Sequence, residues 1–250
     1  AAVWDDPEND ELYRAQVRGL LADLHGFSNR MTKFGRLFGD QTTARIDLSR
    51  PVDFDISALA QSGDDVVAAV LATTWTSAFA AKNAADVLAE EGLQPRRNHV
   101  IIMDEMHRAL RASPLMVEKL DLLTRLNRQW GVGQIMITHT FKDLMCMETP
   151  AQNTKARGFV ERSEIKVLGA LSRIEVDRYL RGECGLPVSR REEDMLEDWA
   201  TPVNFGSDAS HKGLGRFLIK LGGLPGIPIN VEMCPLEKSG FNDTNLKWHA

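Results

Sequence analysis

A chain of 250 residues with 43% hydrophobic and 26% charged residues has the composition of a soluble globular protein, with one large or two small cores. Its net charge of −5 argues against general binding of nucleic acid by bulk electrostatics and leaves room only for a local basic patch. The cysteines Cys146, Cys184 and Cys234 lack metal-site spacing and predict reduced thiols in a cytosolic protein. The longest uncharged run, 66–81, is too short for a membrane span of about 20 residues and predicts a buried helix.

The first predicted elements are a helical segment, a strand and a long helix. Apolar residues at helix-like intervals predict a helix over 7–38. Alternating apolar and acidic residues predict a strand over 51–57. Residues 62–65 fit a capping box, so the long helix is expected to start there and to run to about Glu91.

The stretch 99–105 carries the strongest signal for chemistry. Its apolar run from Val100 to Met103 is typical of a fully buried parallel strand, and it ends in two carboxylates, Asp104 and Glu105. Open α/β sheets bind their ligands at the carboxyl ends of such strands. P-loop NTPases present the acids of the Walker B motif to magnesium and water in this way.

The later elements alternate between helix and strand. The pattern predicts a helix from the Ser113-Pro114 cap to near Trp130, a strand at 134–138, a helix starting at 149–152, a strand at 164–168, capping boxes at 172–175 and 189–192, and a hairpin of 216–221 and 227–233. Strands that alternate with helices imply a parallel sheet with right-handed connections, and the terminal hairpin is expected to add antiparallel strands.

Two residues at the strand end are candidates for catalysis. Asp104 is the candidate magnesium ligand, and Glu105 is the candidate group that orients or deprotonates an attacking water. Helix N-termini also favour acidic residues, so the pair alone leaves a purely structural role open. The second strand delivers Thr138, His139 and Thr140 to the same sheet edge.

The phosphate-binding loop of P-loop NTPases is missing from the chain. That loop reads G-x-x-x-x-G-K-[ST], and no Gly-Lys dipeptide occurs in the 250 residues. Without it nothing cradles the phosphates and no hydroxyl completes the magnesium site. Either the fold is of another kind, or the loop lies upstream of Ala1.

A family resemblance decides between these readings. From Phe34 onward, over some four-fifths of its length, the chain resembles the C-terminal part of the conjugative type IV secretion ATPases, the TraC-like proteins of the HerA–FtsK clade. The matching stretches are 50–57, 102–106, 123–128, 133–140, 157–162 and 215–220. The resemblance implies an α/β fold with a RecA-like, mostly parallel sheet flanked by helices, an N-terminal helical segment and a C-terminal β-hairpin. Because the loop would precede Ala1, the NTPase domain is expected to be incomplete.

The resemblance also implies a domain layout and a sensor. Residues 1–48 would be the end of a helical lobe, 49–237 the C-terminal part of the ATPase domain, and 238–250 a polar tail. The second strand of the family usually ends in Thr-Gln, whose glutamine senses the γ-phosphate. Here Thr138 is followed by His139, and a neutral imidazole can donate one hydrogen bond as an amide does. A histidine that merely caps the strand is the alternative.

Arginines near the end of the preceding helix are candidates for action between subunits. The resemblance implies that Arg125 or Arg128 reaches into a neighbouring subunit as an arginine finger, and we favour Arg128. Cations at a helix C-terminus also complement its dipole, so a structural role stays open. Arg157 and Arg162 are further candidates for a subunit interface.

The leading functional hypothesis is a hexameric, cytoplasmic ATPase, peripheral at the membrane, that powers a conjugation or secretion channel. The intact protein would bind ATP and Mg²⁺ through Asp104, Glu105, Thr138 and His139, with channel proteins at the inner membrane face as partners. DNA contact is unsupported by the charge. The chain by itself is expected neither to bind nor to hydrolyse ATP. A missing central strand would leave its neighbour with unpaired backbone groups, and thus prone to aggregate unless another segment fills the gap.

Two alternatives stay open. Asp104-Glu105-Met106-His107 spells the DExH motif of helicases, although no second RecA-like domain or arginine-rich final motif follows. A non-catalytic scaffold that kept the fold without the phosphate loop is the third hypothesis, favoured if the reading frame starts at Ala1.

Overall fold

The chain forms two compact units, residues 1–97 and 98–250. A computed structural model describes residues 7–41, 46–59, 62–112, 114–145, 149–204 and 210–237, so the predicted cap Ser113 and the polar tail lie outside the described residues. Within that described part, no helix is long and apolar enough to span a membrane. The predicted domain boundaries at residues 48 and 237 stay predictions.

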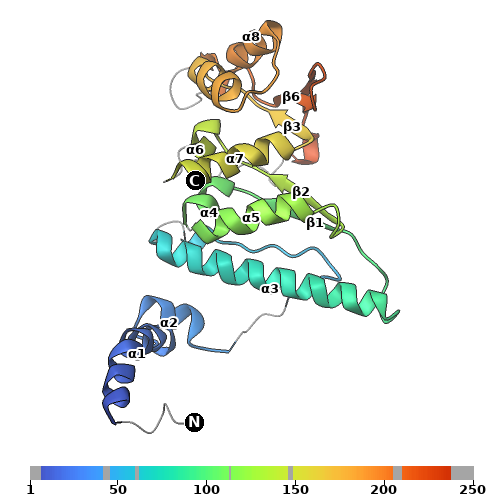
Figure 1. Ribbon diagram of the computed structural model, residues 1–250. Coiled ribbons are helices and arrows are strands. Elements are labelled where there is room, and N and C mark those ends of the chain that lie inside the picture. Colours follow the sequence, from blue (N-terminus) through green and yellow to red (C-terminus); the bar gives the residue numbers. More distant parts are fainter. Residues whose placement is uncertain are drawn as a thin grey trace. The chain divides into compact units, whose positions relative to one another are not determined.

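The first unit is helical (Figure 1). Its elements are α1 (Pro7–Ser28), α2 (Lys33–Phe38), the 3₁₀ helix η1 (Ser57–Leu59) and α3 (Asp64–Glu90). The helical segment predicted over 7–38 is present, but it consists of two helices, because a turn separates α1 from α2. Thr32 caps α2 by accepting a hydrogen bond from the N–H of Gly35. A Cβ at Gly35 would lie 1.9 Å from the carbonyl oxygen of Asn29, so the turn needs a glycine there.

Two predictions for this unit are wrong. Residues 51–56 form no strand; the carboxylate of Asp55 instead accepts a hydrogen bond from the N–H of Ser57, a local turn that competes with strand pairing. The capping box at 62–65 is absent, because Gly63 is the N-cap of α3 and makes no side-chain cap. The Asp65 carboxylate bonds the N–H of Val66 and the ammonium of Lys33 instead.

The second unit alternates strands and helices. Its elements are β1 (His99–Met103), α4 (Met106–Ala112), α5 (Pro114–Leu126), β2 (Val132–Met136), α6 (Phe141–Met145), α7 (Pro150–Arg162), β3 (Ile165–Leu168), the π-helix η2 (Glu175–Glu183), α8 (Arg190–Trp199), β4 (Pro202–Asn204), β5 (Ser210–His211), β6 (Arg216–Leu221) and β7 (Ile227–Asn230). β1 pairs in parallel with β2, whereas β3–β6–β7 and β4–β5 are antiparallel sheets. The predicted α/β class and the closing hairpin, β6–β7, are confirmed.

The parallel pair β1–β2 is covered on one face only. Met103 and Val132 are buried on the inner face. On the other face Val100 and Ile102 are 65% and 64% exposed, and Ile135 of β2 is 48% exposed. The prediction of a fully buried strand at 99–103 is therefore wrong. Among the described residues no third strand pairs with β1 or β2, and no described element of the second unit covers the outer faces of both strands.

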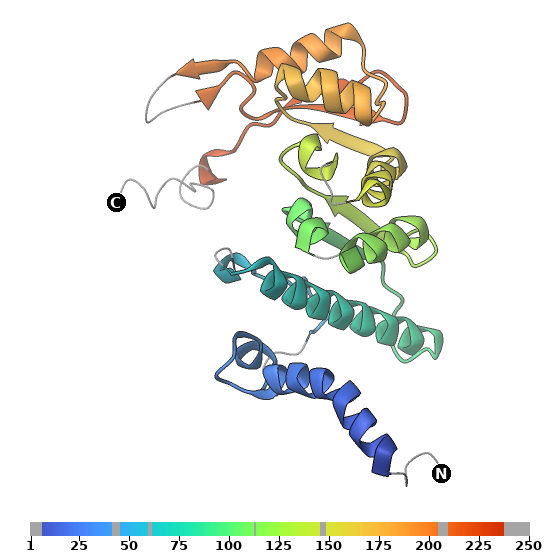
Figure 2. The same cartoon turned by 60° about the vertical axis from the view of Figure 1, so that its left-hand side comes forward.

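The layer over the inner side is built around α5, which lies beside α7 in both views (Figures 1 and 2). Four side chains of α5 are almost completely buried: Met116, Val117, Leu120 and Leu123. Phe159 of α7 is 1% exposed and belongs to the same core. The amphipathic spacing of these residues explains why two short helices pack stably.

A second core joins β3 and β6 to η2 and α8 (Figure 2). Leu168 and Leu218 of the sheet contact a cluster to which the helices contribute Val176, Leu180 and Leu196. α8 starts with the capping box predicted at 189–192, and α7 with another at 149–152.

Glu192 connects α8 to this sheet through buried polar contacts. Its carboxylate accepts hydrogen bonds from the N–H of Ser189 at 2.6 Å, from the Lys220 ammonium at 2.9 Å and from the N–H of Gly226 at 2.6 Å. Burial raises the pKa of Glu192, but these donors outweigh it and lower the pKa from 4.5 to about 2. Lys220 is 1% exposed, so removal of either Glu192 or Lys220 would leave the other as an unpaired buried charge.

The lowered pKa of Glu192 predicts an acid-dependent loss of stability. Its contribution, up to about 3 kcal/mol, is fully present above the ordinary pKa of 4.5 and is lost as the pH falls toward 2. Urea unfolding of wild type and Glu192→Gln should therefore differ most above pH 4.5 and converge near pH 2. Asp194→Asn, at an exposed site on the same helix, is the control. A wild-type advantage independent of pH would contradict this role.

Candidate functional site

The two acids lie in a short connection between β1 and α4 that β2 holds in place. The N–H of Ile137 donates to the carbonyl of Met103 at 2.9 Å, and the N–H of Met106 donates to the carbonyl of Ile137 at 3.0 Å. Asp104 and Glu105 lie between these two bonds. The residues that follow β2, Thr138 and His139, are thereby brought beside the acids, as the sequence predicts.

The backbone of Glu105 is unusual. Its φ of 51° lies in the left-handed region, and Glu105 is the one non-glycine residue of the described part with positive φ. The Asp104 carboxylate accepts a hydrogen bond from the N–H of Glu105 at 2.9 Å, which supports the turn. Left-handed backbone at a bulky residue costs about 1–2 kcal/mol, and such outliers gather at functional sites.

The two carboxylates have different surroundings. Asp104 is exposed and forms no ion pair with any described residue, so its oxygens can take a ligand. Glu105 lies against His139, whose Nε2 is 2.5 Å from Oε1 of the carboxylate. Its other oxygen, Oε2, is 3.4 Å from Nδ1 of His107. The predicted group of Asp104, Glu105 and His139 is therefore assembled, with Glu105 held by the histidine.

Sequence reasoning considered His107 only as part of a DExH motif, and it gave no role to Asp143. Burial raises the pKa of Asp143, but a hydrogen bond from Thr140 and the charges of His107 and Arg111 outweigh it and lower the pKa. Arg111 also bonds the Asp143 carboxylate at 2.6 Å. The signal that could have found His107 was its place two residues after Glu105, at the start of a helix that faces the second strand end.

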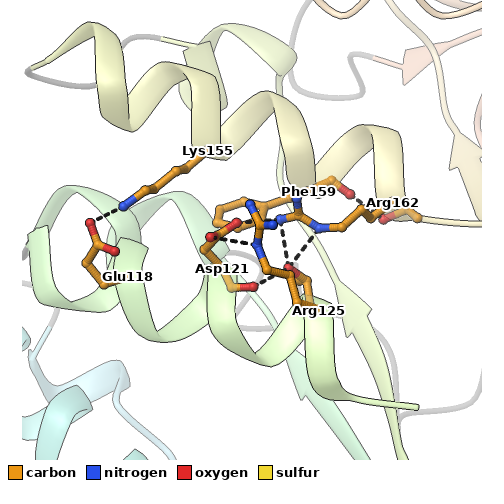
Figure 3. A network of polar contacts seen from close by, with 8 residues as sticks. Glu118, Asp121, Arg125, Lys155, Phe159 and Arg162 are labelled. Carbon is orange, nitrogen blue, oxygen red and sulfur yellow. Dashed lines mark hydrogen bonds and ion pairs between the residues drawn. The ribbon is translucent and has the colours of Figure 1, made fainter. Parts of the chain in front are cut away.

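The side chain of Arg125 is engaged by contacts within the chain (Figure 3). Its Nε bonds the Asp121 carboxylate at 3.0 Å, and the Arg162 guanidinium bonds the other oxygen of Asp121 at 2.7 Å. Arg162 also bonds the hydroxyl of Thr124 at 2.8 Å and lies over the ring of Phe159. This network, together with a Glu118–Lys155 ion pair, links α5 to α7.

The other candidate arginines lie differently. Arg128 is exposed just beyond α5 and has no side-chain partner among the described residues. Arg157 bonds the carbonyl of Glu183 through its Nε. Arg157 and Arg162, which were candidates for a subunit interface, are thus used for contacts inside the unit, whereas Arg128 stays available.

Comparison with known proteins gives a structural match only. No protein-family model and no curated protein matches the chain. Among solved structures, VirB4 of Thermoanaerobacter pseudethanolicus superposes on 92% of the chain with a TM-score of 0.63 and 19% sequence identity. The chain shares the fold of VirB4.

The extent of the match matters for function. The chain spans 55% of the length of VirB4, so 45% of that protein has no counterpart here. The predicted RecA-like α/β class agrees with this fold. At 19% identity the match does not by itself carry over any residue's role.

Proposed function

We propose that this chain is the C-terminal portion of an ATP-hydrolysing motor that powers a type IV secretion or conjugation system. The observation that carries the proposal is the acid pair Asp104–Glu105, which β2 holds next to His139. The fold shared with VirB4 supports it independently. In this proposal the chain supplies the Walker B acids and the sensor, and an upstream segment supplies the phosphate loop.

The residues present fit a shared magnesium–nucleotide site. Mg²⁺ in such sites is held by one or two carboxylates and takes its other ligands from phosphates and water. Asp104 is an exposed carboxylate of this kind. The described residues include no group of three or more His, Cys, Asp or Glu side chains that could hold a metal alone, so the ion would depend on the nucleotide. Bound Mg²⁺ would neutralise charge on the phosphates; Glu105 would accept the proton of a water, and Thr138 and His139 would face the nucleotide.

The motor would act as an oligomer, as a hexamer in the arrangement we favour, beside channel proteins at the cytoplasmic face of the membrane. In each site Asp104 and Glu105 would belong to one subunit, and an arginine would come from its neighbour. The availability of Arg128 supports its assignment over Arg125, whose guanidinium is tied to Asp121. Transported substrate and any DNA contact are left unassigned.

Substitution of each arginine distinguishes action on a neighbouring site from a structural role within the chain. In the hydrolysing form of the protein, Arg128→Ala should lower kcat about 1,000-fold while ATP binding persists, because such arginines stabilise the transition state across a subunit boundary. Arg125→Ala should change kcat less than Arg128→Ala and should lower stability by about 1 kcal/mol, since it removes one partly exposed bond to Asp121. Mixing Arg128→Ala with Glu105→Gln subunits should restore part of the turnover. If Arg125→Ala were the inactive variant, the assignment would be reversed.

The proposal as a whole is tested by ATP turnover in the longer protein. A G-x-x-x-x-G-K-[ST] sequence encoded upstream, together with turnover that requires the upstream segment, supports the motor. Strand separation stimulated by nucleic acid would favour the helicase instead, and a start codon immediately before Ala1 would favour the scaffold.

A further inference from the structure

The contact between Glu105 and His139 creates a difficulty for catalysis. A carboxylate bonded to an imidazole at 2.5 Å has one oxygen occupied and is turned toward that histidine. His139 is also the residue that we expect to face the nucleotide, and its side chain is 71% exposed, so it can move away from Glu105. Glu105 then needs another partner to keep its carboxylate in place.

His107 is placed to be that partner. Its side chain is 13% exposed, and its Nδ1 is buried without a hydrogen-bond partner among the described residues. A buried donor without a partner is unfavourable, so this nitrogen should bond any acceptor that a small movement brings into line. The nearest charged acceptor is Oε2 of Glu105, 3.4 Å away. The rings of His107 and His139 lie 6.0 Å apart, with the carboxylate in contact with both.

Contacts near His107 hold in place the helix that carries it. His107 lies near the start of α4, and Arg111, one turn further along, bonds the Asp143 carboxylate at 2.6 Å. Asp143 is fixed by the hydroxyl of Thr140 at 2.8 Å. The ion pair of Arg111 and Asp143 therefore ties α4, the helix that carries His107, to α6, whereas the exposed His139 is free to turn.

We infer that His107 is a positioning residue for Glu105, which receives the carboxylate through Nδ1–H when His139 releases it. Glu105 would thus have two positions, one held by His139 and one held by His107. The use of these positions in catalysis rests on the proposed ATPase function. The exchange of partners does not, because it involves only residues of this chain and needs no nucleotide.

Imidazole NMR of the 250-residue chain tests the exchange directly. The chain has six histidines, so histidine labelled with ¹⁵N in the ring gives a spectrum that single substitutions can assign. We expect Nδ1 of His107 to carry a proton in the wild type. In His139→Ala the resonance of the Nδ1–H proton of His107 should move downfield, because Glu105 turns toward His107 and the hydrogen bond between them shortens. In the double variant His139→Ala/Glu105→Ala that shift should be lost.

Two further spectra separate positioning from a merely structural role. His25→Ala removes an imidazole of α1 and should leave the His107 resonances unchanged. In the His139→Ala background, His107→Leu should change the chemical shift of the Glu105 carboxyl ¹³C resonance. In the same background, His107→Asn, which keeps an N–H near the position of Nδ1, should return this chemical shift to its value in His139→Ala. An unprotonated Nδ1 in the wild type, or a His107 resonance indifferent to both His139→Ala and Glu105→Ala, would overturn the inference. Neither result would bear on ATP turnover, which tests the proposed function separately.

Discussion

Replacement of Glu105 by glutamine is expected to lower ATP turnover about 100-fold or more in a form of the protein that includes a phosphate loop. Glutamine keeps the size of the side chain and its hydrogen bond to His139 but cannot accept a proton from water, and loss of a general base costs roughly 10²–10⁴-fold in rate. The affinity for ATP should change little, because the effect is on the chemical step and not on binding. Steady-state turnover and equilibrium binding of a fluorescent ATP analogue measure the two quantities.

Asp104→Asn should give a different pattern. The exposed Asp104 carboxylate is the proposed magnesium ligand, so its loss should raise the Mg²⁺ concentration needed for half-maximal turnover. Glu118→Gln is the matched control, since Glu118 is an exposed acid of α5 paired with Lys155 and is not part of the site. Equal effects of all three substitutions, or full activity of Glu105→Gln, would remove the acid pair from the mechanism.

The second large effect expected is self-association of the isolated chain. Val100, Ile102, Ile135 and Ile137 are 44–65% exposed on one face of β1–β2, and no described strand pairs with the outer edge of β2. Apolar faces and unpaired edges of this kind bind other chains. Burial of one such side chain is worth about 1.5–3 kcal/mol, so Ile102→Lys should weaken association about tenfold or more. Sedimentation velocity over a range of concentrations measures this.

A matched control makes the test specific to the sheet. Leu122 is 52% exposed on α5, away from this face, and Leu122→Lys should leave the association constant unchanged. A wild-type chain that sediments as a single monomer at all concentrations would show that the exposed face and edge do not pair. The imidazole spectra are best recorded below the concentration at which association begins.

The sequence predicted the elements that local chemistry determines. The capping box at Ser189 and the helix start at Thr149 form as expected, because each cap is satisfied within four residues. The strand that ends just before Asp104 and its parallel partner were also predicted, since both are short apolar runs bounded by polar residues. These features depend little on what surrounds them.

Two of the errors arose where a long-range partner decides the structure. Residues 51–56 have the alternation of a strand but no described strand to pair with, and Asp55 closes a turn instead. Val100 and Ile102 have the apolar character of a buried strand, but burial depends on a covering layer that the described residues of the second unit do not provide. Hydrophobic periodicity indicates which secondary structure a segment can adopt, but it does not indicate whether the segment that must pair with it or cover it is present.

The features of the candidate site also fall into those that the sequence could predict and those that it could not. Adjacency of Asp104, Glu105 and His139 follows from two parallel strands ending together, so the sequence could predict it. Three features of the site depend on a packed geometry that no sequence periodicity reveals. They are the contact of His107 with Glu105, the left-handed backbone of Glu105 and the ion pair of Arg125 with Asp121. The sequence favoured Arg128 over Arg125, and the ion pair of Arg125 with Asp121 adds a structural difference between the two.

Side-by-side measurement of ATP turnover tests the central claim most directly. The two samples are the 250-residue chain and the same chain extended by the sequence encoded upstream of Ala1. Our account predicts ATP turnover that depends on Mg²⁺ in the extended protein. It predicts no turnover in the 250-residue chain, because that chain contains no phosphate loop to bind the ATP on which Asp104 and Glu105 would act. Turnover by the chain alone, or an extended protein that neither binds nor hydrolyses ATP, would contradict it.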